Sequence, residues 1–301
     1  MVLVLGEILM DVFPECRRIG GAPFNFSYHL HHFGFPVTFI SRIGHDEPGN
    51  QILEILKRNE FDTRGIQTDY KRPTGKVIVH PDTIGGHSFE IVEDAAYDGI
   101  ELPDRPESAT GGTPELLYFG TLIQRTFEAF GKVRRFLSNR SPKTRTLCDI
   151  NLRPGCYSTE TVLKSLEQAD ILKINNEEVE TVKKMLSTGM ETGKFIPWLM
   201  EKYSIEMLSL TRGSQGSELY AGRMHHTAEV PETGPVADTV GAGDAYAAVL
   251  ALGYLKNWPP EKILSKATAF SAEICRIQGA VPEDRSFYRE FIKTIPGETN
   301  A

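Results

Sequence analysis

Short apolar runs alternate with helix-like segments along most of the chain, and this alternation restricts the fold more than any other feature. Val2–Leu5 is a continuous apolar run ended by Gly6, as in a strand buried on both faces. Residues 23–33 carry apolar side chains at helical spacing. Strand-like runs follow at 37–43, 116–119, 146–150, 171–174, 206–211 and 217–221, and helix-like segments at 51–58, 127–137, 159–168, 177–186, 245–255, 260–277 and 285–292. This alternation predicts a mostly parallel sheet with right-handed crossovers.

One stretch between about residues 71 and 93 interrupts the alternation. Residues 75–80 and 87–92 are strand-like and are joined by the Gly-containing turn PDTIGG, which predicts an antiparallel hairpin. Such an insertion can act as a lid over a site. We expect one α/β domain over residues 1–301, with a lid formed by about residues 12–19 and 72–98.

Net charge and cysteine spacing limit the partners and the compartment. The chain of 301 residues has a formal net charge of -7, and nucleic acids and anionic membranes favour clustered Lys and Arg, so we expect neither partner. No apolar run approaches the ~20 residues of a membrane span, and the N-terminus lacks the basic region of a signal peptide. The cysteines form no C-x-x-C pair; they are Cys16, Cys148, Cys156 and Cys275. We expect reduced thiols in a cytoplasmic protein.

The strongest chemical signal is the loop at residues 238–244, DTVGAGD, which precedes the apolar helical segment AYAAVLALGYL. A helix N-terminus presents unpaired N–H groups and a partial positive charge, and glycines let a phosphate approach them. The carboxylate of Asp244 in the first turn could accept a proton from an attacking hydroxyl. The alternative is a buried helix whose N-terminal Asp complements the helix dipole. The sequence contains neither a Walker A motif nor a strand–G-x-G-x-x-G–helix fingerprint.

Further motifs occur in an order that resembles the ribokinase-like (PfkB) sugar kinases across nearly the whole chain. Residues 238–244 resemble the family signature D-T-x-G-A-G-D, and residues 20–25 (GGAPFN) resemble its G-G-x-x-x-N sugar-binding segment. Gly6, Glu7 and Asp11 resemble an opening G-E-x-x-x-D; residues 175–178 (NNEE) and 211–216 (TRGSQG) resemble N-x-x-E and T-x-G-x-x-G. The resemblance implies an α/β fold with three α/β/α layers, a mostly parallel central sheet and a small β-strand lid.

The resemblance also implies the roles of individual residues in phosphoryl transfer. Asp244 would be the catalytic base, and the N–H groups of Gly241, Ala242 and Gly243 would form an anion hole for the phosphoryl group. Short carboxylates and amides suit sugar hydroxyls, since each can take two at once. The implied sugar-binding residues are Asp11, Gly20, Gly21, Asn25 and Arg153.

ATP and metal ions are the implied cofactors. The implied nucleotide-binding residues are Asn175, Thr211, Gly213, Gly216 and Gly243. Asn175 and Glu178 would order Mg²⁺, largely through its waters, because magnesium keeps several of them. Family members often bind a monovalent cation such as K⁺ near the anion hole, where Asp238 and the Val240 carbonyl are the candidates.

Each assignment has a structural alternative. Asp11 could cap a turn, and Asn25 could be a surface residue on a helix. Glu178 lies in the acidic start of a helix, where dipole pairing alone would account for it. Residues 211–216 could form a plain turn between strands.

The acceptor sugar is less constrained than the reaction. Residues 149–154 (DINLRP) resemble the D-x-N-x-R segment of fructokinases and 2-keto-3-deoxygluconate kinases, and Arg153 could clamp an acidic or keto oxygen or form a surface salt bridge. The Gly-Gly-Ala-Pro start is fructokinase-like and lacks the lysine of ribokinases. Phe24 and Phe26 are larger than is usual there and would narrow the pocket if they face the sugar. Fructose is the first expectation; 2-keto-3-deoxygluconate, ribose and a nucleoside are the alternatives.

Two further hypotheses remain from the sequence. A non-catalytic sugar or nucleotide sensor could use the same fold, although a pure binder does not need the base Asp244. A homodimer could form through the lid, since exposed strand edges invite pairing. The histidines at 29, 31 and 32 do not share one helical face, so we expect no metal site there.

Overall fold

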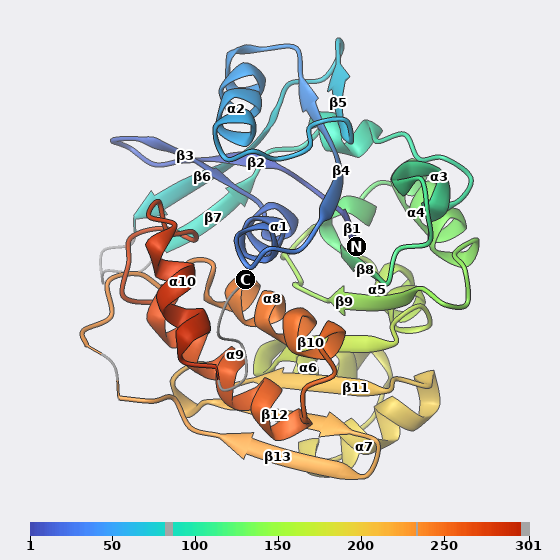
Figure 1. Ribbon diagram of the computed structural model, residues 1–301. Helices are drawn as coiled ribbons and strands as arrows, with labels where there is room; N and C mark the ends of the chain where they lie inside the picture. The colour runs from blue at the N-terminus through green and yellow to red at the C-terminus, as the bar shows by residue number, and fades with distance from the viewer. Residues whose placement is uncertain (82–86, 233, 296–301) are drawn as a thin grey trace.

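The computed structural model describes residues 1–81, 87–232 and 234–295, and within them a nine-stranded sheet forms the centre of the protein (Figure 1). Its strands are β1 (Val2–Leu5), β4 (Val37–Gly44), β5 (Ile66–Asp69), β8 (Leu116–Gly120), β9 (Arg145–Asp149), β10 (Ile171–Asn175), β11 (Met207–Thr211), β12 (Ser217–Ala221) and β13 (Met224–Ala228). The order is β13-β12-β11-β10-β9-β8-β1-β4-β5. From β11 to β5 in this order, each strand runs parallel to its neighbours within that group, whereas β12 is antiparallel to both β11 and β13. The predicted mostly parallel sheet is confirmed.

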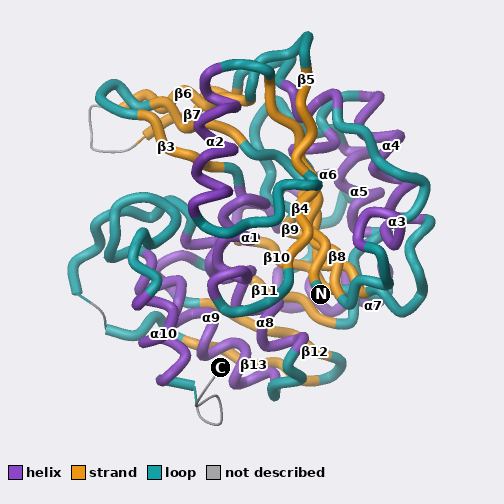
Figure 2. Tube along the Cα trace, turned by 45° about the horizontal axis from the view of Figure 1, so that its top comes forward, coloured by secondary structure: helices purple, strands orange, loops and turns teal. Residues whose placement is uncertain are grey.

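Helices cover both faces of this sheet, because side chains alternate along each buried strand. Val2 and Val4 of β1 belong to one core, and Leu3 and Leu5 to the other. The first core contains α1 (Ala22–His32), α2 (Glu47–Arg58), α8 (Ala242–Leu255), α9 (Pro260–Ile274) and α10 (Ser286–Lys293). The second contains α4 (Phe127–Ser138), α5 (Thr159–Leu166), α6 (Asn176–Met185) and α7 (Thr192–Tyr203). Figure 2 shows strands between helices on both sides, which confirms the three α/β/α layers.

A second, four-stranded sheet projects from one side of the molecule (Figure 1). Its strands are β2 (Leu9–Val12), β3 (Arg17–Gly20), β6 (Gly75–Pro81) and β7 (His87–Ile91), in the order β3-β2-β6-β7. The β6–β7 pair is antiparallel, which confirms the predicted hairpin, while residues 82–86 of its turn lie outside the described residues. A parallel β2–β6 pair joins the two hairpins, so segments far apart in the sequence form one small sheet.

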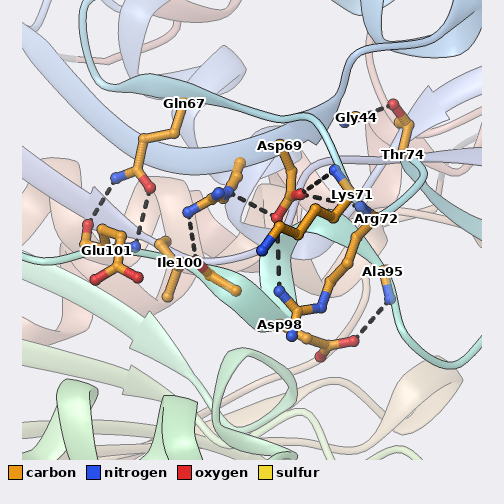
Figure 3. A network of polar contacts seen from close by, with 12 residues as sticks. Gly44, Gln67, Asp69, Lys71, Arg72, Thr74, Ala95, Asp98, Ile100 and Glu101 are labelled. Atoms are coloured by element: carbon orange, nitrogen blue, oxygen red, sulfur yellow. Dashed lines mark hydrogen bonds and ion pairs between the residues drawn. The ribbon is translucent and has the colours of Figure 1, made fainter.

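Polar contacts anchor the small sheet where β6 leaves the main body (Figure 3). The Thr74 hydroxyl accepts the Gly44 N–H at 2.9 Å, and the Thr74 N–H donates to Asp46 at 2.9 Å. Asp69, at the end of β5, accepts the N–H groups of Lys71 and Arg72 at 2.8 and 2.9 Å. These bonds fix the direction in which the chain enters β6.

Some elements differ from the sequence-based expectation. Helix α7 was not predicted, because Pro197 lies inside it and proline disfavours a helix interior. Strands β5 and β13 were also missed, since both are polar and lie at the edges of the sheet. Helix α2 begins four residues before the predicted start, with Asp46 capping the Gly49 N–H. Helix α9 ends at Ile274 rather than at residue 277.

Two further properties of the described residues concern membrane spans and cysteines. None of their helices combines the length and the apolar character needed to cross a bilayer. The four cysteines are free thiols, and Cys148 is buried in the second core.

Candidate functional site

The carboxyl ends of neighbouring parallel strands meet at one edge of the central sheet, where ligands bind in open α/β folds. The register places Gly120 beside Asp149 and Asn175 beside Thr211. Gly6 and Glu7 follow β1, which lies next to β8. The predicted segments that start at Gly6, Asp149, Asn175 and Thr211 therefore lie along the same edge of the sheet.

Helix α8 brings Asp244 to this edge. The N-cap residue, Gly241, has a φ of 77°, a left-handed conformation that glycine adopts without strain. Asp244 lies in the first turn, and its Oδ2 accepts a hydrogen bond of 2.7 Å from the side-chain amide of Asn25. Asn25 is buried in the first turn of α1, not on the surface. The first turns of α1 and α8 thus meet at one carboxylate.

The surroundings of Asp244 adjust its protonation. Burial raises the pKa of Asp244 above its usual value, and the charge of Asp149 raises it further. The hydrogen bond from Asn25 and the charge of Lys173 act in the opposite direction. A carboxylate with a raised pKa is a stronger proton acceptor than one at its usual value, as a general base requires.

The N–H groups at the start of α8 point out of the helix, as expected for an anion hole. The Ala242 N–H already donates to the Thr239 carbonyl at 3.3 Å, so a bound phosphoryl group would have to replace this long bond. The main chain at Gly243 lies close to the Lys173 ammonium, because a Cβ atom at position 243 would be 3.0 Å from Nζ.

Lys173 and Asp149 form a buried ion pair that sequence reasoning missed. Nζ of Lys173 is 3.0 Å from Oδ1 of Asp149, and their side chains are 7% and 0% exposed. Burial tends to lower the pKa of Lys173, but the neighbouring carboxylates, led by Asp149, raise it above its usual value. A protonated ammonium therefore lies beside Gly243 in the first turn of α8. The signal was a lysine inside the apolar run ILKIN, the sequence of β10.

The predicted sugar-binding segment surrounds the Asp11 carboxylate. A Cβ atom on Gly20 would lie 2.2 Å from Oδ2 of Asp11, so only glycine allows this approach. A Cβ atom on Gly21 would lie 2.7 Å from the Glu7 carbonyl oxygen. Burial raises the pKa of Asp11 to about 6, while Arg153 lowers it. Asp11 is paired within β2 and β3 and does not cap a turn.

Asn175 and Glu178 form a capping box at the start of α6. The Asn175 side chain accepts the Glu178 N–H at 2.9 Å, and Oε2 of Glu178 accepts the Asn175 N–H at 2.8 Å. Oε1 of Glu178 accepts the Leu152 N–H at 2.9 Å. Each oxygen of Glu178 keeps one further lone pair, which fits contact with the waters of a hydrated Mg²⁺ better than a direct bond to the ion.

The segment 211–216 forms a tight connection between β11 and β12. The residues Gly213–Gln215 make a 3₁₀ turn, and the Arg212 N–H donates to the Gly216 carbonyl at 2.8 Å. A Cβ atom on Gly216 would lie 2.0 Å from the Ala228 carbonyl oxygen, so the connection packs tightly against β13. This segment lies beside Asn175, at the site edge of the sheet.

Asp238 joins the loop before α8 to the loop after α9. Its Oδ1 accepts the Val240 N–H at 3.0 Å, and its Oδ2 accepts the Gly279 N–H at 3.0 Å. A groove of about 1490 Å³ reaches from Asp11 past Asp238 and Val240 toward α10. Asp244 does not line this groove, and lies instead at the N-terminus of α8 beside Asn25.

Other side chains fall into two groups. Arg153 is exposed, and its charge lowers the pKa values of Glu7, Asp11 and Asp244, which places it at the site. Phe24 and Phe26 are fully buried in the first core, and Phe26 stacks on Tyr118 at 3.9 Å. Packing in the first core therefore accounts for the size of both rings, without any role in narrowing a sugar pocket.

Histidine and acidic side chains do not gather into a metal centre in the part of the chain that the structure describes. His29 is buried and its Nδ1 lies 2.8 Å from the Tyr288 hydroxyl, whereas His32 stacks on Tyr28. Both are structural members of the packing around α1.

Comparisons with known proteins identify the fold and the family. A fructokinase of Salmonella typhimurium is 27% identical over 318 residues, covering 96% of this chain and 99% of that one. The ATP-bound fructokinase of Xylella fastidiosa superposes with a TM-score of 0.82 at 19% identity, covering 97% and 98% of the two chains. A protein of E. coli assigned as ribokinase II, in complex with ATP and Mg²⁺, gives 0.81 at 19% identity, covering 97% and 99%. The family model "pfkB family carbohydrate kinase" matches residues 7–284, and the chain therefore belongs to the pfkB family of carbohydrate kinases.

Proposed function

We propose that the protein transfers the γ-phosphoryl group of ATP to a hydroxyl of a neutral sugar, with fructose and its conversion to fructose 6-phosphate as the first choice. The observation that carries this proposal is the Asp244 carboxylate, which Asn25 holds at 2.7 Å at the N-terminus of α8. That position offers a proton acceptor and an anion-binding helix end within one turn. The membership in a carbohydrate kinase family supports the same reaction.

In the proposed step, the acceptor hydroxyl loses its proton to Asp244 and its oxygen attacks the γ-phosphorus in line. A new O–P bond forms, the bond between the γ-phosphorus and the β–γ bridging oxygen breaks, and ADP leaves. The N–H groups of Gly241, Ala242 and Gly243 lie where charge on the phosphoryl oxygens would be stabilised. The Lys173 ammonium beside Gly243 adds a positive charge at the same place.

ATP and Mg²⁺ are the proposed cofactors. Thr211, Gly213 and Gly216 would line the nucleotide, and Asn175 and Glu178 would hold waters of Mg²⁺, which neutralises phosphate charge when bound. The ATP and Mg²⁺ complex of the E. coli relative supports this choice. Asp238 and the Val240 carbonyl are proposed for K⁺, because the Asp238 carboxylate joins the two loops beside α8.

The acceptor would lie against Asp11, Gly20, Gly21, Asn25 and Arg153. The small sheet would act as a lid that excludes water. The lid would comprise about residues 12–19 and 72–98, within one domain over residues 1–301. A hydrogen bond of 3.4 Å from Arg18 of β3 to Gln278 already links the small sheet to the loop after α9. We also propose that the protein is cytoplasmic and that it forms a homodimer through the strand edges of the lid.

A panel of acceptors with ATP and Mg²⁺ tests the proposed function through ADP release. Fructose is expected to give the highest kcat/KM among fructose, ribose, 2-keto-3-deoxygluconate and nucleosides. A higher value for another acceptor would change the substrate but keep the reaction. Tight binding of sugar and ATP by calorimetry, with no ADP release for any acceptor, would favour the non-catalytic sensor.

A further inference from the structure

Buried polar atoms without a partner gather at one end of the acceptor site. Among the described residues, Oε2 of Glu7, the hydroxyl of Tyr97 and Nη1 of Arg125 are buried without a hydrogen-bond partner. Glu7 is 3% exposed, Tyr97 0%, and the Arg125 side chain 7%. Buried polar groups are nearly always paired, so a cluster of unpaired ones indicates a missing ligand or water. We call these three residues the Glu7–Tyr97–Arg125 cluster.

The three residues come from separate segments: Arg125 lies against the Tyr97 ring, and Glu7 is near enough for its charge to add to the rise that burial causes in the pKa of Tyr97. Glu7 follows β1 and contacts the Gly21 main chain. Tyr97 belongs to the 3₁₀ turn Ala96–Gly99 and packs beneath Gly75 of β6. Arg125 follows the 3₁₀ turn Leu122–Gln124 after β8, and its Cζ is 4.8 Å from the Tyr97 ring centroid.

The cluster is also close to the proposed reacting groups. The charges of Arg153 and Arg125 lower the pKa of Glu7, and the charge of Asp244 raises it. Asn25, which holds Asp244, has its own Oδ1 buried and unpaired. An acceptor with one hydroxyl at Asp244 would therefore extend past Asn25 toward Glu7.

Asp98 fixes the orientation of Arg125. Its Oδ1 and Oδ2 accept hydrogen bonds of 2.7 and 2.6 Å from Nε and Nη2, and Nη2 also donates to the Val92 carbonyl at 3.0 Å. Asp98 itself accepts the Ala95 N–H at 2.8 Å (Figure 3). Asp98 and Val92 thus hold the fork through Nε and Nη2, the Cys156 thiol interacts with the guanidinium, and Nη1 has no hydrogen-bond partner among the described residues.

The chemistry of the cluster matches hydroxyl groups better than a carboxylate. Burial raises the pKa of Glu7 to about 8, so its carboxyl group is protonated at neutral pH and can both donate and accept. Tyr97 can also do both, and Asp98 neutralises the charge of Arg125. A carboxylate would need donors with a net positive charge, whereas adjacent sugar hydroxyls each need a donor and an acceptor.

We infer that the Glu7–Tyr97–Arg125 cluster binds the hydroxyl groups at the end of a neutral sugar remote from the hydroxyl that is phosphorylated. This inference rests on the proposed function and adds the residues that would hold the neutral acceptor and select it over a sugar acid. The alternative is a set of buried waters that serves the fold alone.

Tyr97→Phe is the most conservative test, because it removes one hydroxyl and keeps the ring. Tyr288→Phe is the matched control, since it removes a buried hydroxyl that bonds His29 in the packing around α1. For the best acceptor, Tyr97→Phe is expected to raise KM about 5- to 10-fold, as for one hydrogen bond, with kcat and the KM of ATP unchanged. Tyr288→Phe is expected to leave all three constants unchanged. Equal acceptor KM values in the two variants would overturn the inference and leave the kinase function standing.

Glu7→Gln gives a second test, because a glutamine amide keeps a donor and an acceptor at this position. Acceptor affinity, measured by calorimetry without ATP, is expected to stay within about threefold of the wild type at pH 7. Above pH 8 the wild type should lose affinity as Glu7 deprotonates, and Glu7→Gln should not. A pH-independent wild-type affinity, or tighter binding of a sugar acid than of the matching neutral sugar, would contradict the inference. Acceptor affinity can be measured even if no acceptor is phosphorylated. A lack of phosphorylation would contradict the proposed function but not this inference about binding.

Discussion

The side-chain amide of Asn25 donates a hydrogen bond of 2.7 Å to Oδ2 of Asp244, although the two residues are 219 positions apart. Because each lies in the first turn of a helix, this bond aligns the N-termini of α1 and α8 at the edge of the sheet. The bond leaves Oδ1 of Asn25 free for an acceptor hydroxyl. One amide can thus orient both the proposed base and the sugar.

Asp244→Asn is expected to reduce kcat about 10²- to 10⁴-fold, the usual contribution of general-base catalysis, because asparagine cannot take the proton. The Kd of ATP, measured by calorimetry, should change less than about threefold, since the N–H groups of α8 remain in place. Asp62→Asn is the control, because Asp62 pairs with Arg64 at an exposed position. Full ADP release by Asp244→Asn would rule out the base assignment.

Asn25→Ala tests the influence of Asn25 on the protonation of Asp244. The hydrogen bond from Asn25 stabilises the charged carboxylate and lowers the pKa of Asp244, so its loss raises that pKa. The acidic limb of the kcat–pH profile is therefore expected to move to higher pH. Asn139→Ala should leave the profile unchanged, since the Asn139 side chain donates to the main-chain carbonyl of the exposed Asp104, a contact that does not involve Asp244. An acidic limb that moves to lower pH, or stays in place, would contradict this account.

The local parts of the site could be predicted from the sequence. Glycines at 20, 21 and 241 and the polar residues after each strand follow from short-range rules of backbone conformation and strand termini. The loop before α8 and the segment around Asp11 accordingly lie where the motifs indicated. The alternation of apolar runs likewise predicted the mostly parallel sheet, because parallel strands bury both faces.

Side chains that act through distant partners could not be predicted in this way. Lys173 lies in an apolar run and gains a role from Asp149 and Gly243, which only the folded sheet brings near it. Tyr97 and Arg125 likewise meet through packing between segments that share no local pattern. Such pairs depend on tertiary contacts, which periodicity and motif spacing do not report.

Lys173→Met is expected to lower the free energy of unfolding by about 3–5 kcal/mol at pH 7, because it leaves the fully buried Asp149 carboxylate without its counter-charge. Urea unfolding followed by circular dichroism measures this change. Lys132→Met is the control, since Lys132 pairs with the exposed Glu101 and Glu128, and such pairs contribute about 0–1 kcal/mol. An equal decrease in the free energy of unfolding in the two variants would show that the buried ion pair contributes no more to stability than the exposed pairs.

His29→Gln tests how burial of a histidine makes stability depend on pH. Burial lowers the pKa of His29 from 6.5 to about 3, so the folded state holds it neutral while the unfolded state binds a proton below pH 6.5. The stability that His29 contributes is present above pH 6.5 and is lost as the pH falls toward 3. Between pH 7 and pH 5 this linkage removes about 2 kcal/mol from the wild type.

Glutamine does not titrate in this range, so the fall in the free energy of unfolding from pH 7 to pH 5 should shrink by about 2 kcal/mol in His29→Gln. The exposed His45 provides the control, and His45→Gln should keep the full pH dependence of the wild type. Part of the slope should remain in His29→Gln, because burial also lowers the pKa of His32, to about 4. Urea titrations at pH 7, 6 and 5 separate these contributions, and an unchanged slope in His29→Gln would mean that the histidine is protonated inside the fold.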